Sequence, residues 1–330
     1  MSNLTTFAGI DISKDSFDVC IKTEEEKSLS NQKFVYDPAG MQQAALLLIN
    51  AGCSRAVMEA TGPYYMRLAI SLHQNGLSVC VVNPLVIRRY AQMQLKRTKT
   101  DKADAAIIAG YAIDQCKKLQ AWNPPKAYLV RLSQLSSLRD GLVKHQTALK
   151  NQQAAFLASG TVDPEEALLL TQLVTDTKQR INEVEQRMQT IIETEQPELK
   201  DRLISIPGFG KKTALMLIMI SGGFTRFSNY RQLIAYIGLA PRAYDSGTTI
   251  KGRARVCKMG MSRIRAMLYV CAWSAKRYNV GCKALYDRLL EKNKPRRVAL
   301  IAVANKLLKQ AFAIATHNRY YDPNLIPYKP

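Results

Sequence analysis

The segment FAGIDISKDSFDVCI, residues 7–21, determines how the N-terminal part is expected to fold. Its apolar runs, Phe7 to Ile12 and Phe17 to Ile21, flank a polar turn at residues 13–16. Two such runs around a short polar turn predict an antiparallel β-hairpin. Asp11 interrupts the first run, and a carboxylate is costly to bury in a strand unless a cation or a hydrogen-bond donor meets it. Asp11 is therefore either a paired structural acid or a functional one.

A second acid, Glu59, stands at the end of a predicted strand. Residues 56–58 are an apolar strand core, and Thr61-Gly62-Pro63 turns the chain towards a helix. The carboxyl ends of strands are where α/β sheets place their sites. The alternative for Glu59 is a turn acid or an ion-pair partner.

The segment RTKTDKADA, residues 97–105, places two more acids at the start of a predicted helix. Asp101 and Asp104 are three residues apart, so both lie on one helix face. In the structural alternative, Asp101 caps the helix and Asp104 favours its dipole. Four acids from two strands and one helix can instead converge on a hard divalent cation such as Mg²⁺, which takes carboxylate oxygens.

The rest of residues 1–115 alternates between strands and helices. We expect a third strand at 32–36, helices at 41–50, 64–74 and 83–94, and further strands at 56–58 and 78–82. This alternation, which begins with a hairpin, predicts a mixed α/β sheet flanked by helices.

The composition is that of a folded protein large enough for two domains, with 330 residues, 47% apolar and 22% charged. Seven cysteines without a C-x-x-C pair favour reduced thiols over a disulfide framework or a zinc site. The N-terminus shows no signal-peptide pattern. The longest apolar run, Ala214 to Ile220, is far shorter than the ~20 residues that a membrane span needs. We therefore expect a cytoplasmic protein without a membrane partner.

The net charge of +21 is concentrated in the C-terminal part. Residues 200–330 contain 25 Lys and Arg but 5 Asp and Glu, whereas the first 199 residues contain 22 and 21. So uneven a distribution favours a polyanionic partner over a merely solvated face.

Beyond Pro124-Pro125, two apolar stripes with alternating three- and four-residue steps predict a helical hairpin. The first stripe comprises Leu135, Leu138, Leu142, His145, Leu149, Gln152 and Phe156, and the second comprises Leu170, Val174, Thr177, Ile181, Val184, Met188 and Ile191. His145 and Gln152 are interpreted as polar seam positions. The hairpin is either an oligomerisation arm or an ordinary intramolecular one.

The segment IPGFGKKTALML, residues 206–217, is typical of a helix-hairpin-helix turn. Its backbone N–H groups, with Lys211 and Lys212, would face a DNA phosphate. A plain helix–helix turn is the alternative. A P-loop is excluded, because that motif needs glycine directly before Lys-Ser/Thr and another glycine five residues earlier.

Residues 237–265 surround one small polar segment, Asp245-Ser246-Gly247, with cations. These cations are Arg242, Lys251, Arg253, Arg255, Lys258, Arg263 and Arg265. Serine is a weak nucleophile until a base, a metal or positive charge assists it, and guanidinium groups can stabilise a developing phosphorane. By itself, Ser246 is better explained as a turn residue, since Asp-Ser-Gly is a good turn sequence. Arg296 and Arg297 belong to a further basic link between helices, which we expect on a nucleic-acid backbone.

The motifs GIDISKDSFDV (9–19), MEATGPY (58–64) and KTDKADA (99–105) together resemble the insertion-sequence-110 family of transposases and the Piv site-specific DNA invertases. The resemblance covers nearly the whole chain. It implies an N-terminal RuvC-like domain of RNase H fold with an Asp-Glu-Asp-Asp quartet, which falls on Asp11, Glu59, Asp101 and Asp104. In the family these acids are catalytic and hold Mg²⁺, for which Mn²⁺ can substitute.

The C-terminal half resembles the family's transposase domain, whose motif G-L-x-P-R-x-Y-x-S-G places the nucleophilic serine on Ser246. Cys257 departs from the family pattern at a position where relatives often carry serine. The implied organisation is a RuvC-like domain at 1–120, a helical coiled-coil arm at 121–198, and a basic, mainly α-helical transposase domain at 199–330.

The resemblance implies a DNA recombinase that cuts and rejoins donor and target DNA through a serine–phosphate intermediate. It also implies dimers or tetramers in association with the nucleoid of a prokaryotic cell, and for some members a structured non-coding guide RNA. Two alternatives remain: a RuvC-like structure-selective endonuclease that does not use the serine, and a non-catalytic nucleic-acid-binding protein.

Overall fold

The computed structural model describes residues 5–25, 28–94, 101–242, 245–246, 250–251, 255–256 and 260–324. Within these ranges, the side chains of residues 101, 242, 245–246, 250–251 and 255 lie outside the described set. The chain divides into two units, Met1–Pro124 and Pro125–Pro330, and the division falls at the Pro124-Pro125 pair. Each unit is described by itself.

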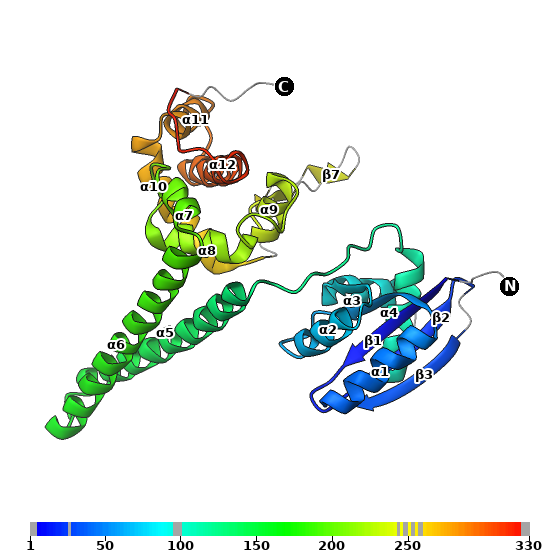
Figure 1. The fold of residues 1–330 in the computed structure, drawn as a ribbon. Helices are drawn as coiled ribbons and strands as arrows, with labels where there is room; N and C mark the ends of the chain where they lie inside the picture. Colours follow the sequence, from blue (N-terminus) through cyan, green and yellow to red (C-terminus); the bar gives the residue numbers. More distant parts are fainter. Residues whose placement is uncertain are drawn as a thin grey trace. The chain divides into compact units, whose positions relative to one another are not determined.

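A mixed five-stranded sheet forms the centre of the first unit (Figure 1). Its strands are β1 (Thr6–Ile12), β2 (Ser16–Thr23), β3 (Ser28–Val35), β4 (Cys53–Glu59) and β5 (Val79–Val82), in the order β3-β2-β1-β4-β5. β2 is antiparallel to both of its neighbours, β1 and β3. β4 is parallel to β1, and β5 is parallel to β4. The hairpin predicted from residues 7–21 and the mixed α/β sheet are thus confirmed.

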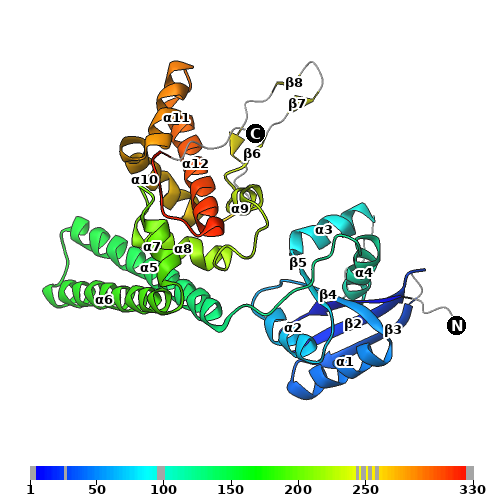
Figure 2. The same cartoon turned by 45° about the horizontal axis from the view of Figure 1, so that its top comes forward.

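Helices cover both faces of this sheet (Figure 2). On one face, α1 (Pro38–Asn50) and α2 (Tyr65–Gln74) pack on alternate strand residues such as Ala8 and Ile10. On the other, α3 (Pro84–Met93) and α4 (Asp101–Asp114) pack on the intervening residues, including Phe7 and Val57. Strand side chains alternate between faces, so a residue's position in the strand tells which helices it meets.

Two of these helices begin where the sequence places a capping side chain. Asp37 accepts a hydrogen bond from the Gly40 N–H at 2.7 Å at the start of α1. Asn83 accepts one from the Leu85 N–H at 2.9 Å at the start of α3. Both helices have proline at their first position, where its missing N–H is not needed.

The second unit is mainly helical. Its helices are α5 (Ala127–Ser159), α6 (Pro164–Glu195), α7 (Pro197–Ile204), α8 (Lys211–Ser221), α9 (Tyr230–Ile237), α10 (Ser262–Tyr278), α11 (Val280–Glu291) and α12 (Arg296–His317). Two small strand pairs stand between α9 and α10: β6 (Pro241–Arg242) with β9 (Arg255–Val256), and β7 (Asp245–Ser246) with β8 (Ile250–Lys251). The helices from α7 through α12 share one apolar core. Residues of α5 and α6 such as Leu132, Val184 and Met188 also belong to it.

α5 and α6 form the predicted helical hairpin, and the predicted seam is right for α6 but only partly right for α5. In α6, Leu170, Thr177, Ile181, Val184 and Met188 are buried, as expected. In α5, the predicted seam position Leu149 is buried, and Leu135 and Leu142 are partly buried against the core. The other predicted positions, Leu138, His145, Gln152 and Phe156, are exposed, and Leu132 and Ser136, which the stripe did not include, are buried. α5 has leucines on several sides, so more than one stripe satisfies heptad spacing. The stripe that meets the apolar face of α6 is the one that is buried.

The glycine-rich segment 205–210 is a turn between α7 and α8. Both interpretations of this segment, a helix-hairpin-helix turn and a plain helix–helix turn, predict such a turn. Gly208 has φ +108° and packs against α10, where a Cβ would lie 2.8 Å from the Cβ of Ala275 and 2.9 Å from the Cys271 carbonyl oxygen. Only glycine combines this backbone conformation with so close an approach. The turn therefore fixes how α8 begins, at Lys211.

α12 is, among the described residues, the one helix long and apolar enough to cross a membrane by length and composition. Half of its apolar window is buried, and Leu300, Val303 and Leu307 lie in the core. Packing against α10 and α11 accounts for its apolar character. The six cysteines that the structure describes are free thiols, as predicted.

Candidate active site and basic surface

Asp11 and Glu59 lie side by side on neighbouring parallel strands. β1 and β4 are in register from Ala8 with Ala56 to Ile10 with Met58, so Asp11 and Glu59 are the next residue on each strand. Phe7 and Val57 pack with α3 and α4, and side chains alternate along a strand, so Asp11 and Glu59 belong to that same face. Two of the four predicted acids thus meet at the carboxyl ends of two inner strands of the sheet.

α4 brings the third acid to this face. Gly9 of β1 has no side chain, and the backbone of α4 occupies the space where one would be, at the Ala105 carbonyl and the Ala109 N–H. Asp104 directly precedes Ala105, and Asp11 is two residues beyond Gly9 on the same strand face. The first turn of α4 therefore lies over the strand segment that carries Asp11. The backbone of Asp101 begins this helix, but its side chain lies outside the described residues.

The structure adds an acid that the sequence interpretation missed. Asp18 of β2 is directly opposite Asp11 in the antiparallel register and is 7% exposed. Its neighbour two residues on, Cys20, packs against Ala105 and Ala109, so Asp18 also faces α4. The Lys33 Nζ lies 4.0 Å from its carboxylate. The signal was present in the sequence, since Asp18 interrupts the second apolar run as Asp11 interrupts the first.

These carboxylates are the hard oxygen donors that Mg²⁺ prefers. Within the part of the chain that the structure describes, however, no three His, Cys, Asp or Glu side chains are close enough together to hold a metal ion. A metal site made by the whole quartet depends on Asp101, whose side chain is outside the described residues. The donor chemistry fits a divalent cation, and the assignment of the metal stays a prediction.

Ser246 lies in the second unit, in the short β7–β8 pair (Figure 2). Its backbone is paired with Ile250, and Asp245 is paired with Lys251. The side chains of Ser246, Arg242, Lys251 and Arg255 are not among the described ones, and Arg253 and Lys258 lie outside the described residues altogether. The roles predicted for this group stay predictions.

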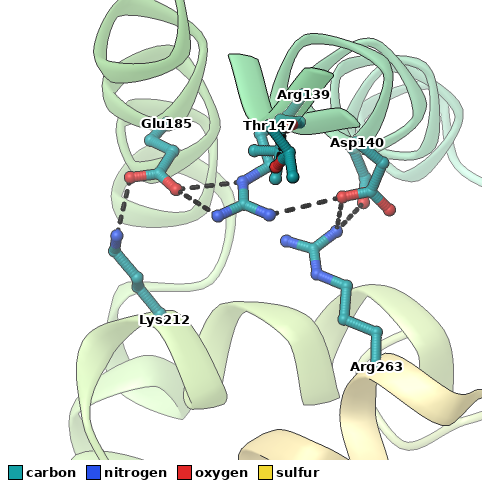
Figure 3. Close-up of polar contacts among 8 residues, drawn as sticks. Arg139, Asp140, Thr147, Glu185, Lys212 and Arg263 are labelled. Carbon is teal, nitrogen blue, oxygen red and sulfur yellow. Dashed lines mark hydrogen bonds and ion pairs between the residues drawn. The ribbon is translucent and has the colours of Figure 1, made fainter. Parts of the chain in front are cut away.

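Three of the other predicted nucleic-acid contacts are already engaged within the second unit, and Figure 3 shows two of them, Lys212 and Arg263. The Lys212 Nζ pairs with Glu185 at 2.7 Å, and the Arg263 guanidinium pairs with Asp140 and donates to the Ser136 hydroxyl. Arg265 donates to the Ile237 carbonyl at 3.0 Å. A cation that is paired with a carboxylate would have to break that ion pair to bind a phosphate, so Lys212 and Arg263 are better explained as structural residues.

Lys211, Arg296 and Arg297 are placed differently. Lys211 is the first residue of α8, and Arg296 and Arg297 are the first two of α12. All three are exposed. The free backbone N–H groups of a helix start favour an anion, so these positions suit a phosphate contact.

The ion pairs in Figure 3 link four helices and give a stability prediction. Glu185 of α6 binds both Arg139 of α5, at 3.0 Å, and Lys212 of α8. Glu185→Ala leaves two cations without their shared partner, and we expect it to lower the free energy of unfolding by about 1–3 kcal/mol. Urea unfolding of the full chain measures this. The control Glu198→Ala removes an exposed carboxylate that pairs with Arg202 and should cost less than about 0.5 kcal/mol.

The same carboxylate predicts a pH dependence. Partial burial raises the pKa of Glu185, but hydrogen bonds from Lys212 and Arg139 more than offset this, so the pKa lies below its usual value. A depressed carboxyl pKa contributes stability that is complete above the unfolded-state pKa and is lost as pH falls through the folded-state pKa. Glu185→Gln should therefore destabilise the chain at neutral pH and flatten the fall of its melting temperature in acid. An unchanged acid slope would contradict the assignment.

Comparison with known proteins gives a consistent picture over both units. Residues 8–162 match a DEDD family of IS110 described as transposase, and residues 200–287 match the family described as transposase IS116/IS110/IS902. The pilin gene-inverting protein of Moraxella lacunata is 30% identical over 97% of this chain and 98% of its own length. The transposase for insertion sequence element IS1328 of Yersinia enterocolitica is 26% identical over 96% and 98%. RuvC of T. thermophilus, solved with a Holliday junction substrate, aligns with 36% of this chain at 11% identity and a TM-score of 0.29.

Proposed function

Because the chain belongs to the IS110 family of transposases, whose members recombine DNA, we propose that it cuts and rejoins DNA through a covalent bond to Ser246. In this proposal the carboxylates of Asp11, Glu59, Asp101 and Asp104 hold Mg²⁺. The observation that carries it is the placement of Asp11 beside Glu59 on the sheet face that α4 covers. Acids on that face and a serine in a cation-rich segment are the groups that phosphoryl transfer needs.

The two proposed transesterification steps need no reactant other than the protein and the DNA strands. The Ser246 oxygen forms a bond to the phosphorus of one phosphodiester, its proton passes to a base, and the bond to one deoxyribose oxygen breaks to leave a hydroxyl. A hydroxyl at another strand end then attacks the same phosphorus and releases the serine. A bound divalent cation would supply charge stabilisation at the phosphate. The number of phosphodiester bonds is conserved, so strand exchange needs no external energy source.

The proposal extends to partners. The basic excess of residues 200–330 supports DNA as the substrate and, for an element that encodes one, a structured non-coding RNA as the guide. Ser246 and the acids lie in separate units, so they can act together within one chain or across protomers of a dimer or tetramer. Sequencing of nucleic acid that co-purifies with the full chain tests the RNA, and light scattering on the DNA complex tests the assembly.

The proposal is tested by trapping the serine adduct. Supercoiled DNA that contains the element's ends and carries an internal label is incubated with enzyme and Mg²⁺, and protein-linked DNA is separated under denaturing conditions. We expect an adduct with the wild type and with Ser262→Ala, an exposed serine at the start of α10, and none with Ser246→Ala. Undiminished cleavage by Ser246→Ala would favour the serine-independent endonuclease. Unimpaired strand exchange by both Asp11→Ala and Ser246→Ala would remove the proposal.

A further inference from the structure

The outward face of α10 carries a row of apolar and aromatic side chains that the core does not use. The inward face buries Ile264, Leu268, Cys271, Ala272 and Ala275. On the opposite side, Val270 is 68% exposed and Trp273 is 47% exposed. Val270, Trp273 and Arg277 follow steps of three and four residues, so they share one helix face. A tryptophan in such a row is an unusual surface residue for a protein without a partner there.

Trp273 is positioned by a cation. The Lys276 Nζ lies 4.1 Å from the centroid of the Trp273 ring and 4.8 Å from that of Tyr286 on α11. Lys276 therefore bridges two aromatic rings from adjacent helices. This contact holds the indole in place on the helix, so a flat ligand meets a ring that is already oriented.

The surroundings of Trp273 are strongly basic. Residues 262–297 contain ten Lys and Arg against two Asp and Glu. Seven of the ten are exposed, and none of the seven forms an ion pair with a described acid: Arg277, Lys283, Arg288, Lys292, Lys294, Arg296 and Arg297. They contrast with Lys212 and Arg263, which are held by carboxylates.

We propose that Trp273 is a stacking platform for an unpaired base of single-stranded nucleic acid, with Lys276 and Arg277 next to the adjoining phosphates. A second copy of the chain would bring the same positive surface to this face, and charge repulsion would oppose it. A polyanion with flat aromatic groups complements both the charge and the indole ring. Duplex DNA offers the charge but keeps its bases stacked inside, so the platform selects a flipped-out base, a loop or a free strand.

The platform does not depend on Ser246 or on a metal, so its test is independent of the proposed recombination chemistry. The chain has two tryptophans, and Trp122→Phe leaves Trp273 as the only one. The full-length Trp122→Phe protein, without divalent cations, is titrated with dT12, with U12 and with a blunt 12-base-pair duplex. Indole emission reports stacking, and the anisotropy of a labelled strand reports binding.

We expect both single strands to quench the Trp273 emission to saturation, with a midpoint at the same strand concentration as in the anisotropy titration. The duplex should quench it little. Trp273→Ala should weaken dT12 binding about tenfold, whereas Trp273→Phe, which keeps a ring, should weaken it less than about threefold. The control Leu138→Ala changes an exposed apolar residue of α5 and should bind as the wild type does. Arg277→Ala should reduce the slope of log affinity against log salt by about 0.7, as expected for one lost phosphate contact.

Three outcomes overturn the proposal. The first is single-strand binding by anisotropy with unchanged indole emission. The second is wild-type affinity of Trp273→Ala. The third is an emission change that follows protein concentration in the absence of nucleic acid, which assigns the face to a second copy. If Trp273→Ala does not fold, the quenching titration and Trp273→Phe still decide. Preference for dT12 or for U12 identifies DNA or RNA as the source of the base.

Discussion

Gly9→Ala is expected to displace α4 from β1 and to destabilise the first unit by about 3 kcal/mol or more. A Cβ at residue 9 would lie 2.8 Å from the Ile108 carbonyl carbon and closer still to the Ala105 oxygen and the Ala109 nitrogen. All three atoms are backbone, so no side-chain rotation relieves the overlap and the helix itself has to move. Because α4 carries Asp101 and Asp104, strand cleavage should be lost even where the variant folds.

Urea unfolding followed by far-ultraviolet circular dichroism measures the loss of stability, and the adduct assay measures the loss of cleavage. Gly141→Ala is the matched control, since Gly141 lies inside α5 and a Cβ there meets nothing within 4 Å. That variant should be stabilised by about 0.5–1 kcal/mol, as alanine is a better helix former than glycine. Wild-type stability of Gly9→Ala would contradict the close packing of α4 on β1.

Asp11→Asn is expected to reduce strand cleavage about a hundredfold to a thousandfold while leaving the fold intact. The substitution keeps the shape of the side chain and removes its charge, so it weakens cation binding without opening a cavity. A metal ion contributes several kcal/mol to a phosphoryl-transfer transition state, and each 1.4 kcal/mol is about tenfold in rate. Glu59→Gln, on the adjacent strand, should act in the same direction.

The control for this prediction is Asp15→Asn, an exposed acid in the turn between β1 and β2. It should cleave as the wild type does, because its exposed side chain lies in the turn and not on a strand of the sheet. Calorimetry with Mn²⁺ in the presence of DNA adds a direct readout, in which Asp11→Asn should bind the cation more weakly and Asp15→Asn should not. Wild-type cleavage and cation binding by Asp11→Asn would assign Asp11 a structural role.

The parts of the molecule that local pattern determines were the predictable ones. The hairpin of residues 7–21 and the places of Asp11 and Glu59 follow from strand alternation and turn residues, which are short-range properties. Strand alternation also places Asp18 within its strand. That Asp18 lies opposite Asp11 depends on the register of the two strands, which the sequence does not display. The exposed His145 and Gln152 show the same limit in helices, because heptad spacing does not say which stripe meets a partner.

Charge was the least predictable property. Lys212 follows a helix-hairpin-helix-like turn and Arg263 belongs to the cation-rich segment around Ser246, and these local patterns assigned both residues to nucleic acid. Their partners, Glu185 and Asp140, are 27 and 123 residues away along the chain, and only the fold brings these groups together. The distribution of charge therefore indicated the class of partner, whereas the choice of individual contact residues needed the structure.

The ion pairs of Arg139, Asp140 and Glu185 with α8 and α10 have a mechanical consequence. They fasten the α5–α6 hairpin near its base, and the helix continues for about 30 Å from Arg139 to its tip, at 1.5 Å per residue. A turn of about 10° at the fastening would swing the tip by about 5 Å over that length. The ion pairs and the apolar contacts of Val184 and Met188 together hold this part of the hairpin, so a load on its far end would act on α8 and α10.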